Sequence, residues 1–128
     1  MSARKRARTA VVITRNFEAN LRRIELFLEA ADAGEFFDRL LDDLLQRVVP
    51  LLERSPKLGP PWEPSDLSHE SRFVLDRIRK QLGAEELRQL LRGDFLLLYL
   101  LSPGQVALLS IRHARERGFQ LAPSARKR

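Results

Sequence analysis

The chain has 128 residues, no cysteine and a formal net charge of +6. Its length is typical of one domain with a single hydrophobic core. The lack of cysteine excludes a disulfide framework, a cysteine-based zinc site and a thiol nucleophile. Hydrophobic residues make up 44% and charged residues 31% of the chain, which excludes a largely disordered protein. The longest apolar run, residues 95–101, is too short to span a bilayer, and we expect a cytoplasmic protein.

Basic side chains are concentrated at the two ends of the chain. Arg4, Lys5, Arg6 and Arg8 lie at the start, and residues 126–128 are all basic. The segment between these ends is therefore nearly neutral. We predict a disordered basic arm over residues 1–9, a single domain over 10–121 and a disordered basic tail over 122–128. Such tails can bind phosphates without sequence preference, or can simply keep the protein soluble.

The first predicted elements are a strand and a helix. Residues 10–14 are mostly apolar and β-branched, which favours a strand. Thr14 or Asn16 could cap the helix that follows. The helix is predicted because apolar residues recur at intervals of four, three and four, at Phe17, Leu21, Ile24 and Leu28.

A second helix is predicted from about Glu35 to Val49. It has a wide apolar stripe, so we expect it to pack against both the first helix and a sheet. Pro50 lacks a backbone N–H and its ring clashes with the preceding turn, which predicts a kink at that residue. One more turn to Arg54 is expected, and residues 55–61 should be irregular.

The C-terminal half contains a third helix and a β-hairpin. The helix is predicted over residues 71–82, with Val74, Ile78 and Leu82 on one face and a glycine after its end. Two apolar runs, 95–101 and 106–113, are joined by a short turn and should form antiparallel strands. Residues 84–91 favour a helix by propensity but directly precede this hairpin. The order of elements indicates an α+β fold with helices packed on a sheet.

The sequence contains no strong catalytic motif, but polar residues cluster where the last strand ends. His113 could act as a general acid or base near neutral pH. Arg112 and Arg115 could bind phosphate or stabilise a charged transition state. Because side chains alternate along a strand, Arg112 and His113 should point to opposite faces. The alternative is that His113 merely ends the strand and the arginines are solvated.

Other polar residues give weaker indications. Arg88 and Arg92 flank the uncertain segment before the hairpin and are candidates for a polar contact. Asp42 and Asp43 are adjacent on a helix, cannot face each other and are expected on a solvated surface. Tyr99 lies among leucines and is expected to be half-buried. Only two histidines are present, which makes a metal site built from several histidines improbable.

Taken together, the pattern resembles the RelE/ParE superfamily of bacterial type II toxins, in particular its plasmid-stabilisation-type members. The resemblance is carried by the order and spacing of four segments, residues 11–17, 51–59, 93–99 and 108–119. It implies a small antiparallel sheet with an N-terminal helical hairpin packed on one face. It also implies a strand over 87–91, just before the hairpin. Residues 62–86 then look like an insertion that contains the extra helix near 71–82.

The resemblance implies a toxin that inhibits growth until a cognate antitoxin protein binds it. Members of one branch are ribosome-dependent mRNA endoribonucleases, which use the RNA 2′-hydroxyl as nucleophile and need no metal or other cofactor. In such an enzyme His113 would be the general acid or base, and Asp94 would orient a partner. Arg112 and Arg115 would bind phosphate, and Phe119 would stack on a base. One departure is Leu96, where ribonucleases of this branch carry an arginine.

Members of the other branch inhibit DNA gyrase by surface contact and need no catalytic residue. Here the target would be contacted by basic side chains near the hairpin and beyond the last strand, namely Arg88, Arg92, Arg115 and Arg117. The sequence does not choose between ribosome-bound mRNA and gyrase as the target. A third alternative is a non-toxic or decayed member that serves only as a protein-interaction module.

Overall fold

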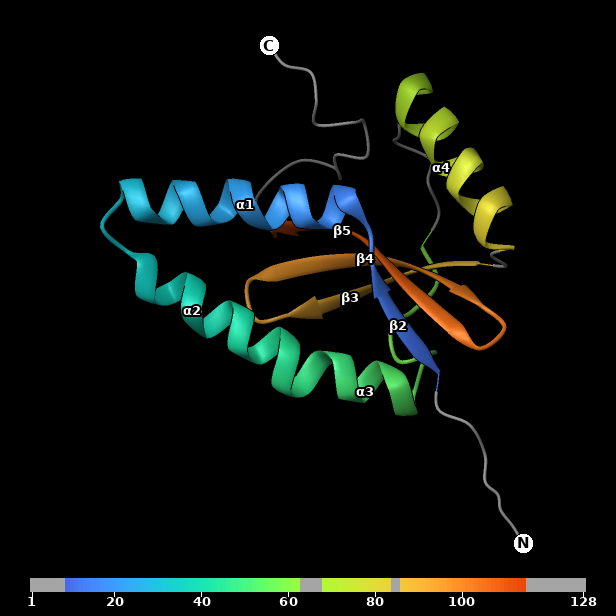
Figure 1. The fold of residues 1–128 in the computed structure, drawn as a ribbon, viewed down its shortest axis with the longest axis horizontal. Helices are drawn as coiled ribbons and strands as arrows, with labels where there is room; N and C mark the ends of the chain where they lie inside the picture. The colour runs from blue at the N-terminus through green and yellow to red at the C-terminus, as the bar shows by residue number, and fades with distance from the viewer. Residues whose placement is uncertain (1–8, 63–67, 84–85, 115–128) are drawn as a thin grey trace, which may run out of the picture.

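The computed structural model describes residues 9–62, 68–83 and 86–114 of the chain, and its fold is α+β. Figure 1 shows the helices arranged around a sheet of four strands. In chain order the elements are β2 (Ala10–Ile13), α1 (Arg15–Ala30), α2 (Gly34–Asp43), the π-helical turn η1 (Leu44–Val48), α3 (Val49–Arg54), α4 (His69–Leu82), β3 (Glu86–Arg92), β4 (Phe95–Ser102) and β5 (Gln105–His113). The expected arm and tail fall almost entirely outside the described residues, as does 115–121 of the expected domain. Thr9, the last residue of the expected arm, is among the described residues, and its N–H donates to the carbonyl of Glu53.

The sheet is mixed, with the strand order β2-β5-β4-β3. The segment 86–92 is a strand, and β3, β4 and β5 form an antiparallel meander. The expectation of a wholly antiparallel sheet is wrong at β2, which pairs in parallel with β5. Tight turns force β3, β4 and β5 to alternate in direction. The connection from β2 runs through the helices, so its pairing direction is free of that constraint.

The helices α2 and α3 are joined through η1 without a break, in one continuous arm (Figure 1). A kink was predicted at Pro50; the structure has α3 running through Pro50 and this π-helical turn directly before it, in which the N–H of Val49 donates to the carbonyl of Leu44. A proline ring clashes with the carbonyl four residues before it, and widening the preceding turn is one way to accommodate the ring. α1 begins as expected, with the Thr14 side chain accepting from the N–H of Phe17.

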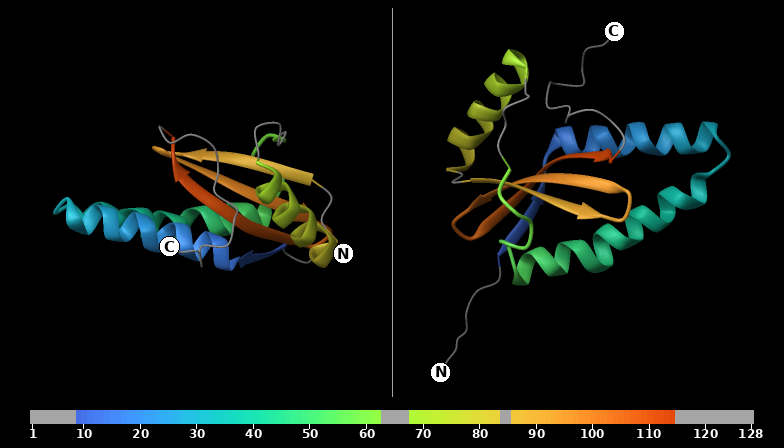
Figure 2. Two further views of the ribbon diagram at one scale, coloured as in Figure 1. Left: turned by 90° about the horizontal axis from the view of Figure 1, so that it is seen from above. Right: turned by 180° about the vertical axis from the view of Figure 1, so that it is seen from behind.

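Apolar side chains form two clusters, one on each face of the sheet. The helical arm and α1 pack on one face, where β4 contributes Leu97, Tyr99 and Leu101. Figure 2 shows this helical layer on one side of the sheet. The opposite face is covered by α4 and Trp62. The most deeply buried side chain described on α4 is Leu75, which takes the place predicted for Val74, and Ile78 of the predicted face packs against the same cluster.

Tyr99 links the middle of the sheet to the loop after α3. It is fully buried rather than half-buried. Its hydroxyl donates to the carbonyl of Pro56 at 2.7 Å and accepts from the N–H of Gly59 at 2.9 Å. Burial raises the pKa of Tyr99, so the hydroxyl remains a donor throughout the neutral range. The loop is therefore held against β3 and β4 by a phenol inside the core.

Candidate functional site

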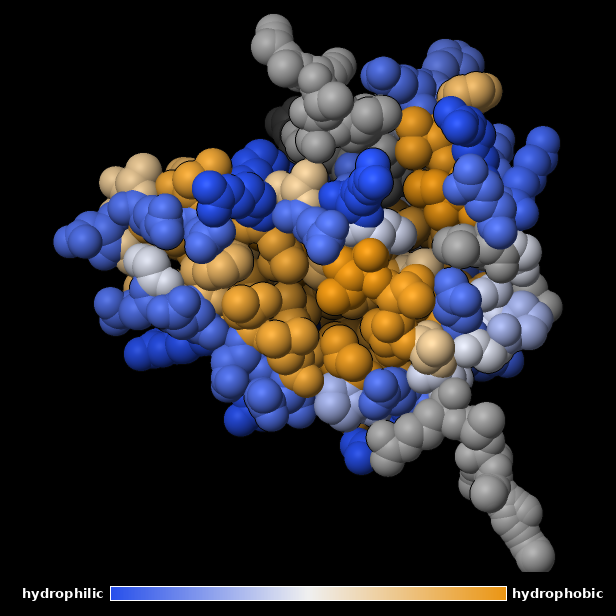
Figure 3. Space-filling view, viewed as in Figure 1, coloured by the Kyte–Doolittle hydropathy of each residue, from blue (hydrophilic) through white to orange (hydrophobic). Residues whose placement is uncertain are grey.

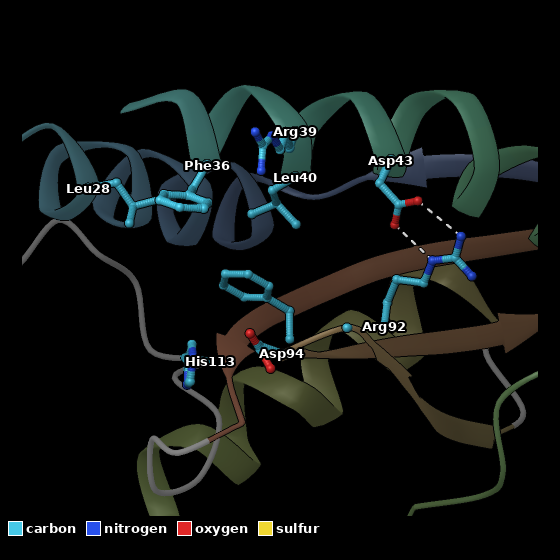
Figure 4. Close-up of a pocket in the computed structure, with 10 residues that line it drawn as sticks. Leu28, Phe36, Arg39, Leu40, Asp43, Arg92, Asp94 and His113 are labelled. Carbon is cyan, nitrogen blue, oxygen red and sulfur yellow. Dashed lines mark hydrogen bonds and ion pairs between the residues drawn. The ribbon is translucent and has the colours of Figure 1, made fainter. Parts of the chain in front are cut away.

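A cleft of about 340 Å³ lies between the helices and the turn that joins β3 to β4. Figure 4 shows the helical wall on one side and the strand ends on the other. This volume is near the lower end of the range of roughly 300–1,000 Å³ found for ligand pockets. The residues that line it are Leu28, Phe36, Arg39, Leu40, Asp43, Arg92, Gly93, Asp94, Phe95 and His113.

The strand pairing brings together two of the residues predicted for catalysis, His113 and Asp94. His113 is the register partner of Phe95, so Asp94 is adjacent to it across the two strands. The His113 and Phe95 rings meet edge to face, with centroids 5.5 Å apart and an interplanar angle of 76°. The N–H of Ala114 donates to the carbonyl of Asp94 at 2.7 Å and closes this end of the sheet. Figure 4 shows both side chains at the same end of the cleft.

The end of β5 is held in place by Asn20 of α1. The register of β5 against β4 shifts between Leu98 and Tyr99, which marks a β-bulge. The buried Asn20 carbonyl oxygen accepts from the Ser110 hydroxyl at 2.8 Å and from the Ile111 N–H at 3.0 Å. These bonds attach the bulged part of β5 to α1, and the second of them lies two residues before His113. Asn20 therefore helps to fix the position of the His113 imidazole.

Replacing Asn20 with alanine should therefore lower the free energy of unfolding by about 2 kcal/mol, because the buried Ile111 N–H loses its acceptor. Chemical denaturation measures this change. Ser110→Ala is the matched control, since it removes one donor but leaves the bond to Ile111, and we expect a smaller loss of about 1 kcal/mol. An Asn20→Ala protein as stable as the wild type would show that this link does not hold the strand.

The opposite end of the cleft is closed by an ion pair between Asp43 and Arg92. Arg92 Nε lies 2.8 Å from Asp43 Oδ2, and Arg92 Nη2 lies 3.0 Å from Oδ1 (Figure 4). Arg47 Nη1 adds a third contact at 3.4 Å. The hydrogen bond from Arg92 is the main reason that the pKa of Asp43 is lowered, and the same contact raises the pKa of Arg92. The pair ties α2 to the end of β3.

The expectation that Asp43 belongs to a solvated face is wrong. Asp43 is partly buried and directly precedes Leu44, one of the core residues. The helical periodicity places it beside the apolar stripe, so its position at the edge of the buried face was readable from the spacing. The spacing could not predict that Asp43 pairs with Arg92, because Arg92 lies far away in sequence and belongs to a strand.

Asp43→Asn should lower the free energy of unfolding by about 1 kcal/mol at neutral pH. Because the pKa of Asp43 is lowered in the folded protein, its ionised form stabilises the fold above its ordinary pKa of 3.8. This contribution should disappear as the pH falls through the lowered pKa. Urea denaturation of both proteins between neutral and acid pH measures the difference. Asp42→Asn, at an exposed neighbouring position, should change stability by less than about 0.5 kcal/mol. A difference that persists undiminished at acid pH would contradict this account.

The other predicted site residues do not line the cleft. Arg112 points to the opposite face from His113, as expected from strand alternation, and its guanidinium donates to the carbonyls of His113 and Ala114. Arg88 donates to the carbonyls of Lys57 and Gly59 and contacts Glu86. It therefore helps to hold the loop after α3. Arg115, Arg117 and Phe119 lie outside the described residues.

Two residues of the cleft wall were not singled out from the sequence, Phe36 and Arg39 on α2. The residue Phe36 is 54% exposed, and the Arg39 guanidinium carbon lies 5.4 Å from the centroid of its ring. Phe36 belongs to the apolar stripe of α2, which suggested a core position. The helical arm continues past the end of the sheet in Figure 1, and this leaves Phe36 at the mouth of the cleft.

Comparison of the sequence with protein-family models finds no match, and no curated protein shows significant similarity to it. In the described part of the chain, no group of His, Asp and Glu side chains is arranged so that it could hold a metal ion. The helices within the same part are all too short or too polar to cross a membrane.

Proposed function

We propose that the protein is the toxin of a bacterial type II toxin–antitoxin pair, of the RelE/ParE type, and that it cleaves mRNA at this cleft. The observation that carries the proposal is the meeting of His113, Asp94 and Phe95 with Arg39 in one cavity. These are a proton carrier, a carboxylate, an aromatic ring and a cation, which together suit a single-stranded nucleotide. Gyrase inhibition through surface contact requires no such cavity.

The arrangement of elements is compatible with this proposal. A short N-terminal strand is followed by two helices, and three consecutive strands complete the sheet. Both helices contribute to one apolar cluster with the sheet, which supports the proposal. The helix α4 packs in the second cluster and lies within residues 62–86, the segment that the resemblance treats as an insertion. Fold alone does not assign function, and the support for a nuclease comes from the side chains of the cleft.

The reaction needs two proton transfers. The 2′-hydroxyl of the RNA attacks the adjacent phosphorus, the bond to the 5′-oxygen breaks, and a 2′,3′-cyclic phosphate and a 5′-hydroxyl are formed. A base must take the proton of the attacking hydroxyl, and an acid must give one to the leaving oxygen. His113 performs one of these transfers in our proposal, and Asp94 orients it. Arg115 and Phe119 keep the phosphate-binding and stacking roles implied by the resemblance.

An antitoxin is the second element of the proposal. Figure 3 shows an extended apolar surface over β2 and between α1 and the α2–α3 arm. Val12 and Ile13 of β2 and Leu45 of η1 are among the exposed apolar side chains. Large exposed apolar surfaces on soluble proteins commonly mark contacts with other proteins. An antitoxin segment that covers this surface would bind without occupying the chemistry of the cleft directly.

The proposal is tested by inducing the chain without its partner in bacteria and following protein and DNA synthesis by pulse labelling. We expect protein synthesis to stop first, with mRNA cut in translated regions. If DNA synthesis stops first while translation continues, the target is gyrase and the ribonuclease proposal is wrong. If neither stops although folded protein accumulates, the chain is a non-toxic interaction module.

A further inference from the structure

Phe36 and Arg39 form the wall of the cleft that faces the strand ends. Both side chains come from α2, three residues apart, so they project from neighbouring positions on the same helix surface. Figure 4 shows them on the helical side of the cavity, with His113 and Asp94 on the strand side. The exposed ring of Phe36 offers an aromatic surface, and the guanidinium of Arg39 lies against that ring.

The charges around the cleft distinguish Arg39 from Arg92. Arg92 donates two short hydrogen bonds to Asp43, and the carboxylate balances the positive charge of the guanidinium. Within the residues that the structure describes, Arg39 forms no ion pair, and its contact is with the Phe36 ring. A guanidinium that stacks on an aromatic ring keeps its N–H donors at the edge and can still bind an anion. Of the two arginines that line the cleft, Arg39 is therefore the one whose charge is available to bind a phosphate.

We propose that Phe36 and Arg39 are the nucleotide-binding wall of the cleft. Phe36 stacks on an unpaired base of single-stranded RNA, and Arg39 binds the phosphate next to that base. The inference rests on the proposed function, because it names how that enzyme would hold its substrate opposite His113. Stacking on an aromatic side chain tolerates any base, so this wall gives affinity with little sequence preference.

Direct binding measurements test the inference without relying on cleavage. The full-length chain is titrated into a fluorescent, single-stranded oligoribonucleotide whose 2′-hydroxyls are methylated, so that it cannot be cut. We expect Phe36→Ala to weaken binding by about tenfold. Arg39→Gln should weaken it by a similar factor, and should reduce the slope of log Kd against log salt by about 0.7.

The chain supplies a matched control in Phe73 and Arg77 of α4. The residue Phe73 is 63% exposed, and the Arg77 guanidinium carbon lies 5.9 Å from the centroid of its ring. The pair therefore has the same chemistry as Phe36 and Arg39, but α4 stands at the other end of the molecule (Figures 1 and 2). Phe73→Ala and Arg77→Gln should change the RNA affinity less than twofold. All four substitutions are on exposed positions, and thermal unfolding verifies that each protein is folded.

Two results would overturn the inference. One is an affinity of Phe36→Ala and Arg39→Gln equal to that of the wild type. The other is a loss of RNA affinity in Phe73→Ala and Arg77→Gln as large as that in the α2 variants, which would indicate nonspecific attraction of RNA to basic surface. Pulse labelling of the wild type separates these failures from failure of the proposed function. If translation still collapses, the enzyme proposal stands and only this wall is wrong.

Discussion

Replacing His113 with alanine is expected to reduce mRNA cleavage by about 10²–10⁴-fold, the usual contribution of a general acid or base. His113 lines the cleft beside Asp94 and is held edge to face against Phe95. His113 lies at the end of β5 and is only partly buried. Loss of its imidazole should therefore leave the fold and the binding of the antitoxin intact. Cleavage is measured with purified ribosomes and a defined mRNA, and antitoxin binding by titration.

The matched control is the other histidine of the chain. His69 is exposed at the start of α4, away from the cleft, so His69→Ala should cleave mRNA at the wild-type rate. Retained cleavage by His113→Ala would remove His113 from the mechanism. A loss of cleavage accompanied by loss of antitoxin binding would instead indicate that the protein had misfolded.

Gly59→Ala is expected to have the largest effect on stability, lowering the free energy of unfolding by about 3–5 kcal/mol. An added Cβ at Gly59 would overlap the backbone oxygen of Gln89 and lie 2.8 Å from its carbonyl carbon. The carbonyl belongs to β3 and cannot rotate away without breaking the sheet. The loop would therefore have to move, which would break the hydrogen bond between the Gly59 N–H and the Tyr99 hydroxyl.

Gly34→Ala provides the comparison, because the nearest atom to its added Cβ is Glu29 Cγ at 3.9 Å, an ordinary contact. At this position the substitution should leave stability unchanged or increase it by about 0.4–1 kcal/mol. Both variants are compared with the wild type by chemical denaturation. If Gly59→Ala unfolds at the same denaturant concentration as Gly34→Ala, the close approach of the loop to β3 does not contribute to stability.

Much of the secondary structure was predictable from local pattern. The spacing of Phe17, Ile24 and Leu28 predicted α1, and the two apolar runs after residue 94 predicted the β4–β5 hairpin. These elements depend on contacts between near neighbours, so a short window of sequence contains the required information. The segment at residues 86–92 was harder. Its residues favour a helix, but pairing with β4 outweighs that propensity.

Only part of the candidate site could be predicted from the sequence. His113 stood out because a polar cluster abruptly ends an apolar strand, and its alternation with Arg112 followed from strand geometry. Asp94 entered only through the resemblance. Phe36 and Arg39 were missed because an amphipathic helix predicts which face is apolar, but not whether the sheet is long enough to cover all of that face.

The sequence by itself determined the type of most elements, the start of α1 near Thr14 and the chemical character of the end of β5. Only the tertiary structure decided that β2 runs parallel to β5, that Asp43 pairs with Arg92 and that Phe36 lies opposite His113. The physical reason is the range of the interactions. Capping, periodicity and turn chemistry act within a few residues. The pairing of β2 with β5 and the ion pair between Asp43 and Arg92 instead join groups far apart in sequence, and the cleft combines residues of both helices with residues at the ends of the strands.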